Sequence, residues 1–215
     1  MYQIVFLLLS SFLLMTCRGV QDKSTIPLPY YNEPTFTPIF LTNKSEIEKT
    51  ITHTIQDFSF LNEDSLWIDQ ERIKGRIHVA NFIFTTCGSI CPTMTKNMKI
   101  VSDSLSTSKN IVFLSYSITP WIDKPAILHR YKMENHIQNP NWHFLTGNKS
   151  AIYNLARQSY FAEEAIGFNK DSSQFLHTEH CILVDKSKRI RGIYNGTLTL
   201  EMKQLIEDIK TLEKE

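Results

Sequence analysis

The sequence has few residues of the kinds that mark a disordered or fibrous protein. Only 7 of its 215 residues are glycine and 8 are proline, and no long tract of glycine, proline or serine occurs. With 42% hydrophobic and 21% charged residues, the composition is typical of a globular protein. Domains usually have ~100–200 residues, and no internal repeat is visible, so we expect one domain with appendages.

An excess of charge of either sign is also missing. The 23 Lys and Arg residues nearly balance the 22 Asp and Glu residues. No basic run is interleaved with aromatic residues, as a nucleic-acid groove would require. The charge pattern therefore argues against nucleic acid as a partner, and we expect the protein to be a monomer.

Cysteine is scarce, with four residues at positions 17, 87, 91 and 181. They are too few and too unevenly spaced for a scaffold stapled by disulfides, so each is interpreted by itself. Cys181 follows no motif and begins an apolar run, and a free cysteine packs like a small hydrophobe. We therefore expect Cys181 to belong to the core.

Long apolar runs are absent apart from one at the N-terminus. Residues Ile4 to Met15 are uncharged and apolar, well short of the ~20 residues that span a bilayer, which is typical of a signal peptide. The run ends in Leu-Met-Thr-Cys, which resembles a bacterial lipobox, so residues 1–17 are expected to be a signal with a lipid attached to Cys17. An uncleaved anchor helix is the alternative. Both place the domain outside the cytoplasm, tethered to a membrane of the cell envelope.

The remaining chain divides into a spacer and a domain. Residues 18–49 contain four prolines among other turn-forming residues and are expected to be an extended linker. Residues 50–215 are expected to form the domain. Its apolar patterns predict a hairpin, two strand-then-helix units, a further helix, a second hairpin and a final helix: 58–60 with 66–68, 77–84 with 92–105, 111–118 with 124–134, 149–160, 181–185 with 190–194, and a C-terminal helix that buries Met202, Leu205, Ile206, Ile209 and Leu212.

This order predicts an α/β protein with a thioredoxin-like fold. A mixed central sheet is flanked by helices on both faces, with an N-terminal β-hairpin and a second β-hairpin inserted before the C-terminal helix.

The pair Cys87 and Cys91 lies where a buried strand turns into a helix. One helical turn separates the two residues, so their sulfurs can form a disulfide or share a metal. A helix N-terminus favours thiolate over thiol, so at least one of them should be unusually acidic. A purely structural disulfide is possible in an exported protein, but so short a loop gains little from closure. A thiol–disulfide oxidoreductase and a soft-metal binder both remain open.

His177 lies just before the predicted strand 181–185, in a segment that should lead back to the cysteines. A redox thioredoxin has a proline there to hold its substrate, and this chain has none after Pro140. Two thiolates and one imidazole suit Cu(I), can hold Cu(II), and also fit zinc. His180 is a weaker candidate ligand, and the remaining histidines are interpreted as structural.

These residues give the sequence its resemblance to the Sco/SenC family of copper metallochaperones, which extends from about residue 50 to 214. The matching stretches are DFSF at 57–60, NFIFTTC at 81–87, CPTMT at 91–95, LS at 114–115, WHFLTG at 142–147, HT at 177–178 and LVD at 183–185. The resemblance implies copper binding by Cys87, Cys91 and His177, and assistance in inserting copper into a copper-binding subunit of cytochrome c oxidase. Reduction of cysteines in an exported partner is the alternative function. Gly88, Ser89 and Thr119 depart from residues that are common in the family.

Overall fold

The computed structural model describes residues 27–163 and 178–215, and within them nine strands form one sheet in the order β2-β1-β9-β8-β5-β6-β7-β3-β4. The strands are β1 Tyr30–Tyr31, β2 Pro38–Ile39, β3 Ser59–Asn62, β4 Trp67–Asp69, β5 Ile77–Ile83, β6 Ile111–Ser117, β7 Trp142–Thr146, β8 His180–Val184 and β9 Ile190–Asn195. The helical segments are α1 Lys44–Thr50, η1 Gln70–Arg72, α2 Ile90–Ser104, α3 Pro125–Glu134, α4 Lys149–Asn154, η2 Leu155–Ser159 and α5 Thr199–Lys214.

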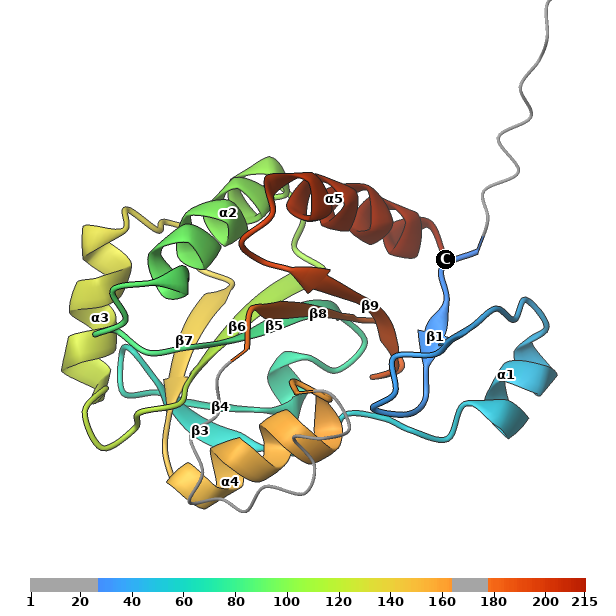
Figure 1. Ribbon diagram of the computed structural model, residues 1–215, viewed down its shortest axis with the longest axis horizontal. Helices are drawn as coiled ribbons and strands as arrows, with labels where there is room; N and C mark the ends of the chain where they lie inside the picture. The colour runs from blue at the N-terminus through green and yellow to red at the C-terminus, as the bar shows by residue number, and fades with distance from the viewer. Residues whose placement is uncertain (1–26, 164–177) are drawn as a thin grey trace, which may run out of the picture.

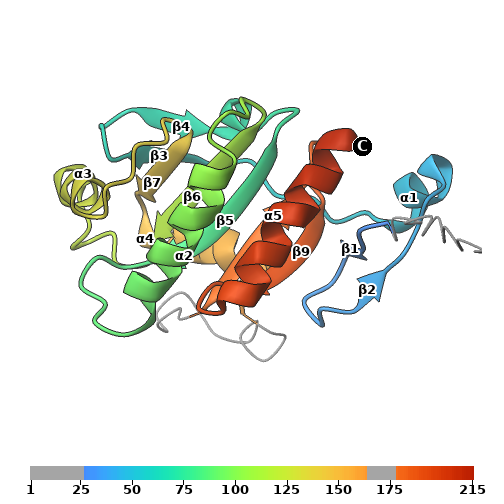
Figure 2. The same cartoon turned by 90° about the horizontal axis from the view of Figure 1, so that it is seen from above.

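The centre of the sheet is parallel, with β5 beside β6 and β6 beside β7, and β8 pairs with β5 in the antiparallel direction. All seven residues of β5 and of β6 are buried, as expected for strands covered on both faces. Helices α2 and α5 cover one face and α4 covers the other, while α3 lies beside β7 at one end (Figures 1 and 2). The predicted mixed α/β architecture is therefore confirmed.

Most of the predicted elements are present, with two differences in the middle of the chain. Both hairpins form, and α5 buries all five of its predicted apolar residues. The short strand β7, whose five residues are all buried, has no counterpart among the predicted elements. The helix expected over 149–160 changes into a π-helix at Leu155, so α4 itself ends at Asn154.

The expected extended linker differs from the structure where residues 27–49 are described. Tyr31 pairs with Ile190, so β1 extends the sheet beyond β9. Residues Lys44–Thr50 form α1, because Asn43 caps its first turn by accepting a hydrogen bond from the backbone of Glu46. This part of the spacer contains a strand of the sheet and a short helix. Residues 1–26 lie outside the described part.

The two ends of the sheet carry different parts of the chain. Asn81, near the end of β5, pairs with Cys181 at the start of β8, so the segment after β5 lies at that end. The other end contains the turn between β8 and β9, where Tyr31 of β1 meets Ile190. Within residues 27–163 and 178–215, no helix combines the length and apolar character needed to cross a membrane.

Two buried histidines make stability depend on pH. Burial lowers the pKa of His78 to about 3 and that of His143 to about 4. The histidines of the unfolded chain take up protons below about pH 6.5, the ordinary pKa, whereas those of the folded chain do not. Their contribution to the free energy of unfolding is therefore fully present above that pH and is lost as the pH falls. We expect each histidine to cost roughly 2 kcal/mol of unfolding free energy at pH 5 relative to pH 8.

Urea denaturation at the two pH values measures this loss. The double variant His78→Asn/His143→Asn should lose most of the difference, whereas His129→Asn, at a histidine that is half exposed, should retain it. An unchanged difference in the double variant would assign the pH dependence to other groups.

Candidate metal centre

Cys87 and Cys91 lie on the turn that joins β5 to α2. The backbone amide of Cys87 donates to the carbonyl of Phe84 at 3.2 Å, which closes the turn after the strand. Ser89 precedes α2 but makes no side-chain capping bond. The Cys87 sulfur accepts a hydrogen bond from the Cys91 amide at 3.4 Å instead, in the manner of a helix cap. The helix therefore begins at Ile90, two residues before the predicted start.

The pKa values of the two thiols are shifted in opposite directions. Burial alone would raise the pKa of Cys87, but hydrogen bonds from the backbone of Cys91, Ser89 and Ile90 stabilise its thiolate, and the net result is a lowered pKa. Burial raises the pKa of Cys91 to about 12, aided by its hydrogen bond to Cys87 and the charge of Asp123. The lowered pKa of Cys87 agrees in direction with the prediction that one cysteine is acidic.

Asp123 is a fully buried carboxylate that holds the cysteine turn against the end of β6. Its oxygens accept bonds from the Thr85 amide at 3.2 Å, the Thr85 hydroxyl at 2.5 Å, the Ser117 hydroxyl at 2.6 Å and the Thr119 hydroxyl at 2.9 Å. Four donors on one carboxylate stabilise its charge in the interior. Thr85 is two residues before Cys87, so Asp123 fixes where the turn begins.

Asp123 and Tyr131 are not among the predicted site residues. Tyr131 lies on α3, where its hydroxyl bonds to Thr95 of α2 at 2.8 Å, and burial is the main cause that raises its pKa to about 12. A signal for Asp123 existed, since it closely follows a buried strand, and side chains after parallel strands gather at one edge of a sheet. Tyr131 carried no comparable signal, because only tertiary packing brings α3 to the cysteines.

The described residues supply two of the three predicted metal ligands. His177 lies outside them, as does Cys17, so both remain predictions. Residues 27–163 and 178–215 contain no group of three His, Cys, Asp or Glu side chains that could hold a metal ion. A third ligand from these residue types would therefore have to come from beyond this part of the chain. The donor atoms fit copper, because two adjacent sulfurs suit a soft ion. The lowered pKa of Cys87 also favours the thiolate form that binds metal.

His180 and Cys181 are part of the packing of the domain. The His180 ring nitrogen Nδ1 lies 3.1 Å from the Ala162 carbonyl oxygen, and its ring meets the Phe36 ring edge-on. Cys181 is completely buried, and burial raises its pKa to about 12. The expectation that Cys181 is a core residue is confirmed. All three cysteines in the described residues are free thiols.

We expect iodoacetamide to alkylate Cys87 first in the reduced, metal-free protein near neutral pH. The thiolate is the nucleophile, and Cys87 has the lowered pKa, whereas Cys91 and Cys181 have raised values. Timed quenching followed by peptide mass spectrometry gives the rate at each cysteine. We expect Cys87 to react at least about tenfold faster than Cys91, since the pKa difference exceeds one unit. Faster labelling of Cys91 would contradict this assignment.

Comparison with known proteins agrees with this geometry. The model of the SCO1/SenC family matches residues 47–214, which is most of the chain. The chain belongs to the SCO1/SenC family. The matched region includes both cysteines, Asp123 and the segment that contains His177.

Solved structures of SCO1/SenC proteins show the same fold. A SCO1/SenC family lipoprotein from Bacillus anthracis is 26% identical, with a TM-score of 0.66 over 76% of this chain and 96% of that one. BsSco, described as a cytochrome c oxidase assembly protein with a disulfide switch, is 30% identical, with a TM-score of 0.64 over 75% and 94%. Copper-bound ScoI from Bradyrhizobium japonicum, 19% identical with a TM-score of 0.58 over 74% and 99%, shows the fold alone. These structures confirm the predicted thioredoxin-like fold of the family.

Proposed function

We propose that this SCO1/SenC protein is an exported, membrane-tethered copper metallochaperone that assists assembly of the copper centre of cytochrome c oxidase. Cys87, Cys91 and His177 would hold Cu(I) or Cu(II). The observation that carries the proposal is the pair of free thiols on the β5–α2 turn, where backbone amides favour ionisation of Cys87. The positive charge of copper would balance the negative charge of the thiolates. Copper would be the cargo of the protein.

His177 is proposed as the third ligand from its position in the chain. The described chain resumes at Thr178 and enters β8 at His180, and Cys181 on β8 pairs with Asn81 near the end of β5. Residue 177 thus directly precedes a segment at the cysteine end of the sheet. A known relative of the same fold holds copper, which supports the choice of metal.

The tether is proposed from the N-terminal sequence. The apolar run from Ile4 to Met15 ends at Cys17, and one similar SCO1/SenC protein is described as a lipoprotein. We propose that Cys17 carries the lipid and that the domain works outside the cytoplasm. Intact-mass analysis tests this directly. A chain that retains residues 1–16 with an unmodified cysteine would contradict lipidation.

A second candidate function is thiol–disulfide exchange with an exported partner. It is favoured by the unequal acidities of Cys87 and Cys91, because an acidic attacking thiol beside a less acidic one is typical of redox pairs. BsSco is described as having a disulfide switch, which makes the same chemistry plausible here. The absence of any proline after Pro140 counts against a general oxidoreductase.

One experiment separates the two functions. Reduced full-length protein, wild type and His177→Ala, is titrated with copper under anaerobic conditions, and its rate of reduction of a generic disulfide is compared with that of a thioredoxin. We expect one copper per chain in the wild type. His177→Ala should bind Cu(I) weakly and should lose or strongly alter the Cu(II) form with its sulfur-to-metal charge-transfer absorption. His180→Ala should change little. Intact Cu(II) binding in His177→Ala, with thioredoxin-like reduction rates, would favour the oxidoreductase.

A further inference from the structure

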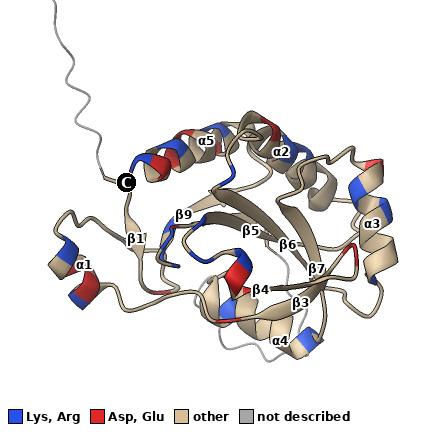
Figure 3. Cartoon of the chain, turned by 180° about the vertical axis from the view of Figure 1, so that it is seen from behind, with Lys and Arg blue, Asp and Glu red and all other residues tan. Residues whose placement is uncertain are grey.

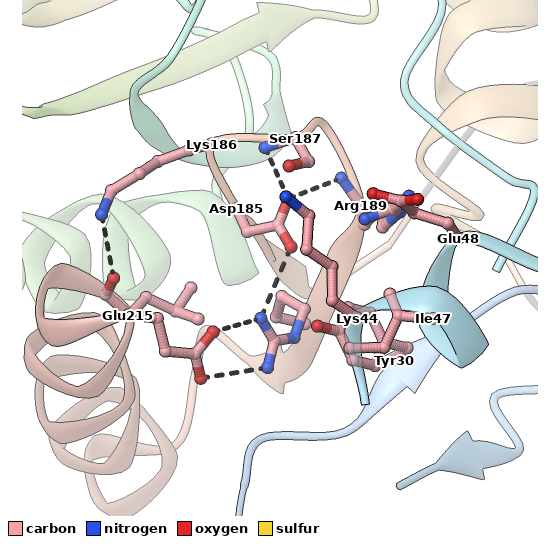
Figure 4. Close-up of a pocket in the computed structure, with 11 residues that line it drawn as sticks. Tyr30, Lys44, Ile47, Glu48, Asp185, Lys186, Ser187, Arg189 and Glu215 are labelled. Carbon is pink, nitrogen blue, oxygen red and sulfur yellow. Dashed lines mark hydrogen bonds and ion pairs between the residues drawn. The ribbon is translucent and has the colours of Figure 1, made fainter. Parts of the chain in front are cut away.

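A polar cavity lies at the end of the sheet opposite the cysteines. Its volume is about 510 Å³, which is within the range of small-molecule pockets. The turn between β8 and β9 forms one side, α1 and Tyr30 form another, and the end of α5 closes it (Figure 4). Figure 3 shows Lys or Arg in several segments around the start of β9, beside β1.

Arg191 is built into the wall of this cavity and is fully satisfied there. Its side chain is 2% exposed and binds Glu215 through two nitrogens, at 2.7 and 3.2 Å, with Asp185 at 3.4 Å. It also donates to the carbonyl oxygens of Leu28 and Pro29, and its guanidinium lies 4.0 Å from the centre of the Tyr30 ring. Arg191 thus engages both nearby carboxylates, and one negative charge of the pair is left over.

Asp185 also stabilises the turn between β8 and β9. One of its oxygens accepts hydrogen bonds from the backbone amides of Ser187 and Arg189, at 2.8 and 3.0 Å. These bonds fix the β8–β9 turn. Asp185 and Glu215 are held by these bonds and by Arg191, and in the described residues neither bonds to the side chain of another cation that lines the cavity.

Three cations remain: Lys44, Lys186 and Arg189. In the described part of the chain, neither Lys44 nor Arg189 makes a side-chain hydrogen bond or an ion pair, and Arg189 Nε is buried with no partner. The Lys186 amine reaches only the carbonyl oxygen of Leu212, at 3.4 Å. Glu48, which Figure 4 draws beside Arg189, is the one lining carboxylate that is not engaged by Arg191. A buried donor without a partner is costly, and the Nε of Arg189 is such a donor in a side chain that is otherwise partly exposed.

We propose that this cavity binds a phosphate group, held by Arg189, Lys44 and Lys186. A guanidinium offers paired donors that match phosphate oxygens, and two ammonium groups add charge and further donors. The cavity is also large enough to hold the organic part of a phosphodiester.

Position in the fold favours a phospholipid headgroup over free phosphate as the source. Tyr30 lines the cavity and Arg191 binds the carbonyl oxygens of residues 28 and 29, so the chain that leads from the N-terminal segment joins the domain at this point. This choice of source rests on the proposed membrane tether, while the preference for phosphate does not.

The first test measures phosphate binding by the full-length chain in a non-ionic detergent. Isothermal titration calorimetry with inorganic phosphate and with glycerophosphoglycerol, the acyl-free headgroup of phosphatidylglycerol, should show saturable binding. The variant Lys44→Gln/Arg189→Gln should bind at least about tenfold more weakly, as expected for the loss of a charge-assisted hydrogen bond. The control Lys96→Gln/Lys203→Gln removes equal charge from exposed positions away from the cavity and should bind like the wild type.

Circular dichroism verifies that the double variant is folded. Absence of saturable binding, or equal binding by Lys44→Gln/Arg189→Gln, would overturn the proposed site.

The second test identifies the source of the phosphate. The full-length chain is inserted into nanodiscs of phosphatidylcholine with or without phosphatidylglycerol, and hydrogen exchange is followed in peptides covering residues 28–31 and 185–191. Slower exchange in the anionic discs, but not in the Lys44→Gln/Arg189→Gln variant, supports a headgroup. Unchanged exchange together with tight inorganic phosphate binding overturns the headgroup and leaves free phosphate. Failure to insert into either disc contradicts the tether alone, because the titration still tests the site.

Discussion

Tight copper binding is expected to be lost when either Cys87 or Cys91 is replaced by serine. A hydroxyl is a hard, neutral donor, so each variant leaves one thiolate and one proposed imidazole for a soft ion. Even loss of a group that merely supports a ligand lowers metal affinity by ~10–100-fold, so loss of a thiolate should exceed ~100-fold. Competition with a Cu(I) chelator under anaerobic conditions measures the affinity.

Oxidation should abolish tight copper binding as either serine substitution does. A disulfide between Cys87 and Cys91 consumes both thiolates, so oxidised protein is expected to bind almost no copper until it is reduced. Cys181→Ala serves as the control, because that thiol is completely buried in the core and should leave the copper stoichiometry unchanged. Wild-type affinity in Cys91→Ser would show that the pair does not act as a unit and would refute the proposed site.

Replacing Asp123 by alanine is expected to destabilise the protein and weaken its copper site together. The substitution leaves buried donors on Thr85, Ser117 and Thr119 without their acceptor, which should cost roughly 3 kcal/mol or more of unfolding free energy. Release of the turn at Thr85 should also lower copper affinity by about 10-fold or more, as for other supporting groups around metal sites.

Urea denaturation and the chelator competition measure the two effects separately. Asp123→Asn retains an oxygen acceptor and should lie between alanine and the wild type. Asp103→Ala removes an exposed partner of Lys99 and should change stability by no more than ~0.5 kcal/mol. If Asp123→Ala lost stability but bound copper with full affinity, the carboxylate would support the fold and not the site.

Much of the fold could be predicted from the sequence because its central strands are buried on both faces. Continuous apolar runs indicate β5 and β6, and the helical spacing of apolar residues indicates α5. The strand β7 was missed because it is short and its second residue is a histidine, which lies between two aromatic residues that occur in helices as well as in strands. Its identity depends on pairing with β6 and β3, which no local pattern reveals.

The candidate site was predictable only in part. The spacing of Cys87 and Cys91 and their place at a strand-to-helix turn predict a thiolate pair, and the structure confirms the turn. The early start of α2 could not be predicted, because a cysteine sulfur takes the place of the usual capping oxygen. Asp123 and Arg191 are buried charges that depend in part on partners distant in the sequence, Thr85 for Asp123 and Glu215 for Arg191, so local pattern alone does not reveal their burial.

The layout of the sheet also determines how far the protein can reach. Tyr31 meets β9 at Ile190, whereas Cys87 follows the other end of β5, so the seven-residue length of β5 separates them. At ~3.3 Å per residue this is about 20 Å. With the proposed tether at the Tyr31 end, the cysteines lie at the end of the sheet that is farther from the point where the tether enters the domain. We therefore expect a recipient that projects its metal-binding residues above the membrane surface to meet them more readily than one that lies flat on the bilayer.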